Sequence, residues 1–192
     1  MKKTVENLTK AFIGESMARN RYTFYASTAR KEGYEQIAEI FLMTADNENE
    51  HAEWNFKMLQ QLKPAEKFEE ILVQAAAPTT WGTTLENLKA AIAGETYEYT
   101  EMYPEFARVA KEEGYKDISG RLKSIAVAEK HHQERYSKLL AEVQAGTVFK
   151  KAQPVWWYCS KCGYMEFGIE PPLRSPSCDH ERSYYRVLNE VY

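Results

Sequence analysis

The sequence predicts a mainly α-helical protein: a four-helix bundle with one long crossover, followed by a small domain of short strands and metal knuckles. Two observations lead to this class. Apolar residues recur at helical spacing through four long segments, and this pattern stops at Gly146, where proline, aromatic residues and strand-like runs take over. A chain of 192 residues that is 44% hydrophobic can bury one core and a small second unit. We therefore expect domains at 1–146 and 153–192.

The four predicted helices form two hairpins that repeat one another. Helical periodicity covers 5–25, 37–62, 85–106 and 118–143. The stretch "ARKEGYEQI" returns as "AKEEGYKDI", which places Gly33 and Gly114 in two short turns. The repeat offset is 80 residues between Gly14 and Gly94 but 81 at the turns, so the second copy contains one extra residue.

The hairpins are joined by the segment "LKPAEKFEEILVQAAAPTTWGTT", which has a proline near each end. A connection of this length is typical of a long crossover rather than a tight turn. We expect a short helix inside it.

Each predicted helix carries one glutamate on the stripe that should face the core. Counted from the turn glycines, these glutamates lie 15 to 19 residues away. At a rise of about 1.5 Å per residue, they meet at one level of the bundle. A histidine follows two of them at i+3, on the same helix face. The set is Glu15, Glu48, His51, Glu95, Glu129 and His132.

This set matches the ligands of ferritin-like di-iron carboxylate bundles, in which two helices give one glutamate each and two give Glu-x-x-His. A single Glu-x-x-His is usually part of a solvated face, but here two repeat in register on apolar stripes. Buried carboxylates without cations would cost several kcal/mol each, which a marginally stable domain cannot absorb. The sequence therefore predicts a two-metal site.

Glu98 adds a further carboxylate on one side of the predicted site only. It follows Glu95 by one turn, whereas the first hairpin has Ala18 at the matching position. By spacing alone, an exposed helix charge is an equal alternative. Charge counting favours a ligand, because an additional carboxylate suits two ferric ions better than two ferrous ions.

Composition excludes several classes of function. The net charge is −3 and the isoelectric point about 5.9, so no basic face recruits nucleic acid or anionic lipid. Apolar runs fall short of the roughly 18 residues that cross a membrane. The N-terminal "MKKTVENLTKAF" lacks the apolar region of a signal peptide. We expect a cytoplasmic protein.

The C-terminal segment carries three cysteines in a metal-binding pattern. "CSKCG" is one knuckle, and "SPSCDH" has the form of a second knuckle whose first cysteine is serine. The expected ligands of iron or zinc are Cys159, Cys162, Ser175 and Cys178. Three alternatives stay open here: Ser175 as an alkoxide or hydroxide ligand, His180 in its place, or a weakened site.

With these motifs assembled, the whole chain resembles rubrerythrins. The resemblance is carried by "GES", "ENEH", "GETYEYTEMYPEFA" and "AEKHH" in the bundle, and by "WYCSKCGY" at the start of a rubredoxin-like domain. It implies a cytoplasmic peroxidase that reduces hydrogen peroxide to water and protects against oxidative stress. It also implies seven di-iron ligands: Glu15, Glu48, His51, Glu95, Glu98, Glu129 and His132.

In the family, one iron exchanges a glutamate for a histidine on reduction, and by motif these are Glu98 and His51. The resemblance further implies a homodimer in which electrons pass from the mononuclear iron to the partner's di-iron site. Electrons would come from NADH through an external donor, such as a rubredoxin or its reductase. The family's mononuclear iron has four cysteine ligands, and this chain has Ser175 in place of one of them. This difference affects the mononuclear iron and therefore the entry of electrons.

Two other readings use the same residues. A ferroxidase that handles iron would share the bundle and its ligands, although it has no need of an attached cysteine domain. A helical scaffold with a zinc-stapled tail would have no redox chemistry. We assign the tyrosines near the site to core packing rather than to a relay: Tyr22, Tyr25, Tyr97, Tyr99 and Tyr103.

Overall fold

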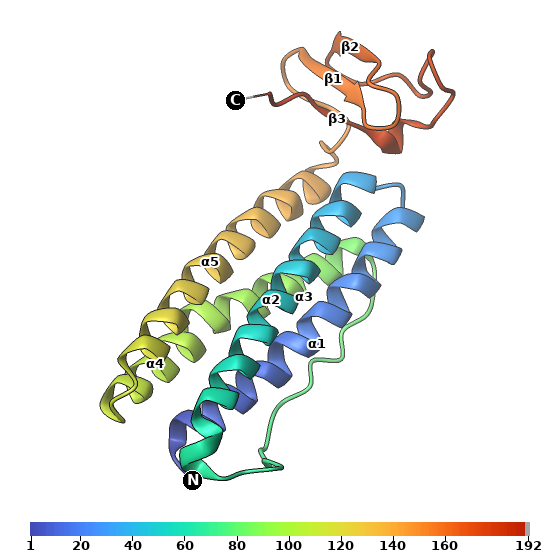
Figure 1. Cartoon of the computed structure of the whole chain (residues 1–192). Coiled ribbons are helices and arrows are strands. Elements are labelled where there is room, and N and C mark those ends of the chain that lie inside the picture. Colours follow the sequence, from blue (N-terminus) through green and yellow to red (C-terminus); the bar gives the residue numbers. More distant parts are fainter. Residues whose placement is uncertain (191–192) are drawn as a thin grey trace.

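The computed structural model describes residues 1–190 as a bundle of long helices with a small β domain at one end (Figure 1). The last two residues of the predicted domain 153–192 lie outside this description. The predicted class, a four-helix bundle with a long crossover and a small C-terminal domain, is confirmed. The bundle contains α1 (Lys3–Lys31), α2 (Glu35–Glu66), α3 (Thr84–Tyr97), the π-helix η1 (Glu98–Met102), α4 (Tyr103–Glu112) and α5 (Lys116–Ala145).

The turn of each hairpin caps the first helix of the other hairpin. Gly33 and Gly114 adopt φ of 82° and 92°, a left-handed conformation that favours glycine. The residue before each glycine is a glutamate. Glu113 accepts hydrogen bonds of 3.0 Å from the backbone N–H groups of Lys3 and Thr4 at the start of α1. Glu32 accepts from Thr84 N–H at the start of α3, at 3.1 Å.

The extra residue of the second repeat coincides with the π-helix. The offset is 80 at Glu15 and Glu95 but 81 at Tyr22 and Tyr103, and η1 lies between Glu95 and Tyr103. A π-helix takes up one more residue per turn than an α-helix. It therefore absorbs the insertion, and α4 continues with the helix face matching that of α1.

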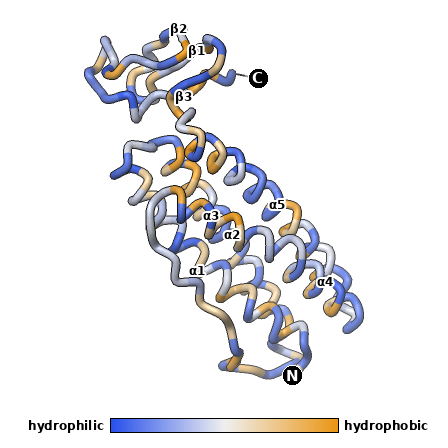
Figure 2. The backbone as a smooth tube through the Cα atoms, turned by 180° about the vertical axis from the view of Figure 1, so that it is seen from behind, coloured by the Kyte–Doolittle hydropathy of each residue, from blue (hydrophilic) through white to orange (hydrophobic). Residues whose placement is uncertain are grey.

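The crossover, residues 67–83, contains no helix within the described chain, so the expected short helix is wrong. The 32 residues of α2 span about 48 Å, and the crossover must return over that length to the start of α3. Extended backbone at about 3.3 Å per residue reaches roughly 56 Å over this segment, whereas helical turns would leave it short. Figure 2 shows it running along the outside of the bundle.

Polar residues divide the bundle core into two apolar clusters. One contains Leu8, Met58 and Leu122, and the other contains Tyr22, Phe41 and Leu88. On α1 the dividing residue is Glu15, which lies between Ala11 of the first cluster and Ala18 of the second. No helix within residues 1–190 is long and apolar enough to cross a membrane.

The small domain is an antiparallel sheet with strand order β2-β1-β3. Its elements are β1 (Val155–Cys159), β2 (Met165–Gly168), the 3-10 helix η2 (Arg182–Tyr184) and β3 (Tyr185–Val187). Arg186 forms an ion pair with Glu39 of α2. Phe149 stacks on Tyr34, with ring centroids 6.3 Å apart. These contacts place the domain at the end of the bundle where α1 turns into α2 (Figure 1).

Candidate metal centre

Four glutamates from four helices meet between the two apolar clusters. Each is fully buried, with 0% of its surface exposed: Glu15 on α1, Glu48 on α2, Glu95 on α3 and Glu129 on α5. His132 is 3% exposed, and the His51 side chain 13%. The four glutamates therefore lie at one level of the bundle, as their spacing in the sequence predicts.

The ligand atoms form two overlapping groups. Glu15, Glu48, His51 and Glu129 bring one atom each within 4.8 Å of one another, and Glu48, Glu95, Glu129 and His132 do the same. Glu48 and Glu129 belong to both groups. Two ions that share Glu48 and Glu129 would use every one of these residues, because each ion would have one further glutamate and one histidine of its own.

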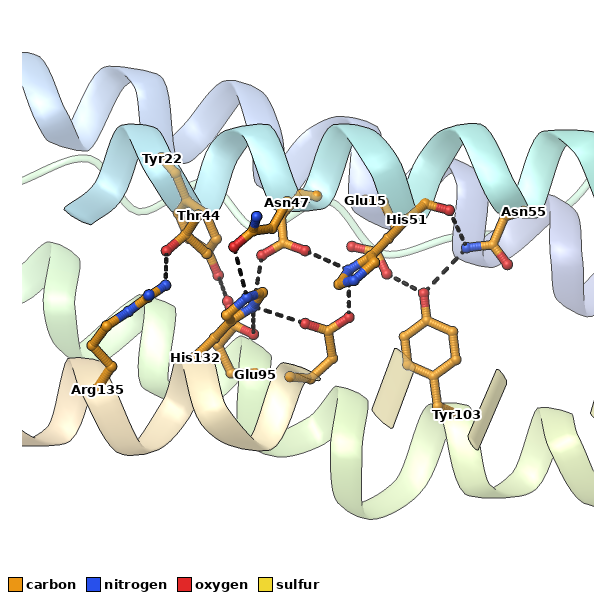
Figure 3. Close-up of polar contacts among 12 residues, drawn as sticks. Glu15, Tyr22, Thr44, Asn47, His51, Asn55, Glu95, Tyr103, His132 and Arg135 are labelled. Atoms are coloured by element: carbon orange, nitrogen blue, oxygen red, sulfur yellow. Dashed lines mark hydrogen bonds and ion pairs between the residues drawn. The ribbon is translucent and has the colours of Figure 1, made fainter. Parts of the chain in front are cut away.

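Both imidazoles turn their Nδ1 atoms toward the carboxylates (Figure 3). His51 Nδ1 lies 2.9 Å from Glu48 and 2.8 Å from Glu129. His132 Nδ1 lies 2.9 Å from Glu129 and 3.1 Å from Glu48. Burial opposes protonation, but these carboxylates outweigh it and raise the pKa of His51 to about 10 and that of His132 to about 12.

Two buried tyrosines donate hydrogen bonds to Glu15 and Glu95, the two glutamates that belong to only one ligand group each. These hydrogen bonds go beyond the packing role expected for the tyrosines. Tyr22 donates to Glu95, and Tyr103 donates to Glu15, so each tyrosine reaches a carboxylate of the other hairpin. Asn55 donates to the Tyr103 hydroxyl at 3.2 Å. Among the other tyrosines expected in the core, Tyr25 is buried, Tyr99 is half-buried, and Tyr97 is exposed.

Glu98 lies beside the two groups and belongs to neither. It is the first residue of η1, is 7% exposed and lines a pocket of about 330 Å³ together with Arg21 and residues of the crossover. Burial and the neighbouring Glu95 hold the pKa of Glu98 well above its usual range. The alternative of an exposed helix charge is therefore wrong, whereas its role as a ligand stays a prediction.

The residues present fit a pair of divalent cations. Five buried carboxylates share two imidazoles and, beside Glu98, the guanidinium of Arg21. Within the described residues, Glu15 Oε2 has no polar partner, and Glu95 Oε2 and both oxygens of Glu129 face only the histidine Nδ1 atoms. Burial is the main reason that the pKa of Glu15 lies well above its usual range and that of Glu95 at about 8. Unpaired buried oxygens that converge on a point are expected where a cation binds.

The cysteine site consists of two knuckles with matching hydrogen bonds. Gly163 N–H donates to Cys159 O at 2.9 Å, and Asp179 N–H donates to Ser175 O at 2.9 Å. Gly163 and Asp179 both have positive φ, 77° and 58°. Ser175 therefore occupies the position of the first cysteine of its knuckle, as the spacing predicts.

The three thiols group together, with Ser175 at the fourth corner. Cys159, Cys162 and Cys178 form one potential metal-binding cluster. Ser175 is 2% exposed and places Oγ 3.4 Å from Cys162 Sγ. His180 is exposed, directs Nδ1 to the Cys178 carbonyl at 3.2 Å, and lies outside the cluster. The geometry favours Ser175 over His180 as the fourth ligand.

The bundle and its ligand groups define a class, the ferritin-like di-iron carboxylate proteins. The sequence profile of the rubrerythrin family matches residues 6–140. The chain belongs to the rubrerythrin family, as its resemblance to that family indicated.

Named relatives and solved structures agree with this assignment. The chain is 55% identical to a putative rubrerythrin of Methanocaldococcus jannaschii, covering 100% of this chain and 96% of that one. It is 42% identical to a rubrerythrin of Nitratidesulfovibrio vulgaris, covering 97% and 94%. A solved structure of fully reduced, all-ferrous nigerythrin matches with a TM-score of 0.65 at 32% identity, covering 98% of this chain and 88% of that one. A bacterioferritin of Mycobacterium tuberculosis, 17% identical over 76% of this chain and 91% of its own, shares the fold with a TM-score of 0.65.

Proposed function

We propose that this chain is a non-haem di-iron peroxidase of the cytoplasm, which reduces hydrogen peroxide to water with electrons relayed through its cysteine site. The observation that carries the proposal is the presence, in one chain, of two ligand groups that share Glu48 and Glu129, and of a separate cluster of three thiols. The first suits a pair of irons, and the second suits one iron or zinc.

The residues divide the work of holding the ions. Glu48 and Glu129 would bind both, Glu15 and His51 one, and Glu95 and His132 the other. When bound, irons supply Lewis acidity and the two electrons that peroxide reduction requires. The Tyr22 and Tyr103 hydroxyls fix the orientation of Glu95 and Glu15, each through a single hydrogen bond.

Glu98 and His51 are the proposed catalytic residues. Reduction of one peroxide consumes two protons as well as two electrons and yields two waters. Glu98 lies at the pocket, and its raised pKa allows its carboxyl group to carry a proton at neutral pH. The family resemblance implies that Glu98 and His51 alternate as ligands, and a carboxylate that leaves an ion is a suitable proton carrier.

The pocket above Glu98 provides access for a small polar substrate. Its volume is about 330 Å³, and Arg21, Gly94 and Met102 contribute to its wall. From the crossover, Gln74, Ala75, Ala76 and Pro78 also line it. A pocket of this size accepts hydrogen peroxide easily, and Glu98 is the buried carboxylate that lines it.

The electron path needs a partner. Glu129 precedes the end of α5 by 16 residues, or about 24 Å of helix, so the cysteine domain of the same chain lies far from the carboxylates. A homodimer that places the cysteine site of one subunit near the iron pair of the other would shorten this path. An external protein linked to NADH, such as a rubredoxin or its reductase, would deliver the electrons.

The test is anaerobic reconstitution with ferrous iron, metal counting per chain, and visible spectra before and after hydrogen peroxide. We expect an iron pair that peroxide oxidises faster than oxygen does, and a further iron at the cysteine site. Glu98→Gln should slow oxidation by peroxide while iron binding persists. Glu101→Gln, which changes an exposed glutamate of the same π-helix, is the matched control.

Two results would contradict the proposal. Faster oxidation by oxygen, with many irons stored per chain, would favour a ferroxidase. Zinc at every site and no reaction with peroxide would favour a structural protein.

A further inference from the structure

The two histidines of the metal centre occupy equivalent positions in the repeat but have different surroundings. His51 and His132 are related by the offset of 81 residues, and both direct Nδ1 at Glu48 and Glu129. Their other ring nitrogens differ. This difference is independent of Glu98, which breaks the symmetry on another helix.

His132 is held at its far nitrogen. Its Nε2 lies 3.2 Å from Oδ1 of Asn47, a residue of α2 (Figure 3). The amide oxygen only accepts hydrogen bonds, so the ring must donate Nε2–H. When the ring is deprotonated to bind an ion, this donor keeps the remaining proton on Nε2 and leaves the lone pair on Nδ1, which faces the three carboxylates of Glu48, Glu95 and Glu129. Asn47 thus fixes both the proton and the ring plane of a predicted ligand.

His51 has no such partner within the described chain. Its recorded polar contacts involve Nδ1 only. The residue that the 81-residue offset pairs with Asn47 is Ala128, whose side chain offers no acceptor. Consistent with this, the His51 side chain is 13% exposed, against 3% for that of His132. The ring of His51 can turn without breaking a hydrogen bond at Nε2.

We infer that Asn47 is a positioning residue that makes His132 a permanent ligand, and that alanine at position 128 leaves His51 free to bind and release. Ligating histidines usually donate their second N–H to such a partner, and losing it costs about 10–100-fold in metal affinity. The inference deepens the proposed function and rests on it. It explains from the structure why one histidine rather than the other would exchange.

The test uses zinc, which is diamagnetic, and the full chain with isotopically labelled histidine rings. The chain has four histidines, so the NMR signals of His51 and His132 can be assigned after His131→Gln and His180→Gln. Zinc is titrated into the metal-free protein. The readouts are the zinc affinity reported by each ring and the exchange of its Nε2–H with water.

In Asn47→Ala we expect the affinity reported by His132 to fall about 10–100-fold and its Nε2–H to exchange faster, with His51 unchanged. Asn47→Asp keeps an acceptor at the same reach and should restore slow exchange. Ala128→Asn should slow the exchange of the His51 Nε2–H with water and raise the zinc affinity reported by His51 by a similar factor. With iron bound, Ala128→Asn should lower peroxide turnover at unchanged iron content.

Asn49→Ala and Val127→Asn change exposed neighbours on the same two helices and should behave as wild type. Two zinc ions bound in the wild type, with His132 unaffected by Asn47→Ala, would overturn the inference and leave the metal pair standing. A wild type that binds no zinc at either histidine would overturn the proposed function itself.

Discussion

At the scale of single residues, the hydroxyls of Tyr22 and Tyr103 link the two halves of the metal centre. Each donates a hydrogen bond to a glutamate on the opposite hairpin. Because both carboxylates are fully buried, no water can replace a lost donor without rearrangement. The tyrosines therefore contribute to the site even before metal binds.

Replacing Tyr103 with phenylalanine should destabilise the metal-free protein. Glu15 would lose the one donor that it has among residues 1–190, and Asn55 would lose an acceptor, at a cost of about 1–3 kcal/mol. Urea unfolding in the presence of a chelator measures the difference. Tyr97→Phe removes an exposed hydroxyl and is the control; equal losses in both variants would refute the argument.

At the cysteine site, Ser175 changes the acidity of its neighbours. Its hydroxyl, followed by the backbone N–H of His180, lowers the pKa of Cys178 to about 7. Burial raises the pKa of Cys159. In the metal-free protein, alkylation of Cys178 by iodoacetamide should therefore rise through pH 7, ahead of Cys159.

Ser175→Ala should move this transition to higher pH, because the largest stabilising contact of the Cys178 thiolate is gone. Peptide mapping after timed alkylation separates the three thiols. A Cys178 profile that Ser175→Ala does not shift would show that the hydroxyl has no such effect.

Much of the site follows from residue spacing alone. Glu15, Glu48, Glu95 and Glu129 could be placed at one level because helix rise is constant and the turns mark the origin. The bonds of Tyr22, Tyr103 and Asn47 could not, because they depend on helix rotation and side-chain rotamers across helices. The one available signal was that each of these residues lies within a turn or two of a predicted ligand.

At the scale of elements, the repeated "EGY" stretch does more than turn the chain. The glutamates Glu32 and Glu113 each cap the first helix of the opposite hairpin. They satisfy N–H groups that a helix start leaves open and place negative charge at the positive end of its dipole.

Glu113→Ala and Glu32→Ala should each lower the free energy of unfolding by about 0.5–2 kcal/mol. Glu113 should have the larger effect, since it accepts from two backbone groups. Thermal unfolding of the metal-free chain measures both. Glu53→Ala, which removes an exposed glutamate paired with Lys57, should change little, and a comparable loss there would contradict the capping role.

The elements show where sequence reasoning stops. The one-residue change of offset locates the insertion, but it does not say whether a loop, a kink or a π-helix absorbs it. The crossover contains residues with good helix propensity, "FEEILVQAAA". Its conformation is decided by the distance it must cover, which is a property of the assembled bundle rather than of the segment.

At the scale of the whole molecule, the buried charges give metal-free and metal-loaded protein opposite responses to pH. A group whose pKa is higher in the folded than in the unfolded chain stabilises at low pH, and that stability is lost as pH rises through the folded value. Folding raises the pKa of Glu95 from 4.5 to about 8 and that of His51 from 6.5 to about 10. Folding lowers the pKa of Glu129, so Glu129 changes the pH dependence of stability only below about pH 4.5.

The metal-free protein should therefore lose stability, on the order of a few kcal/mol, between about pH 5 and pH 10. With metal in excess the trend should reverse, because the ligands bind metal only when deprotonated. Melting curves across this range, with chelator or with metal, measure both slopes. Glu95→Gln should flatten the metal-free curve; a curve that is flat in the wild type would refute the prediction.

The shared glutamates have a consequence for how the chain holds together. One ligand group takes Glu15, Glu48 and His51 from the first hairpin but Glu129 from the second, and the other takes Glu95, Glu129 and His132 from the second but Glu48 from the first. Neither hairpin can complete a group by itself. Each bound ion would therefore link the two hairpins, which the crossover joins by a single covalent connection. A chain cut within residues 67–83 should reassemble when metal is supplied.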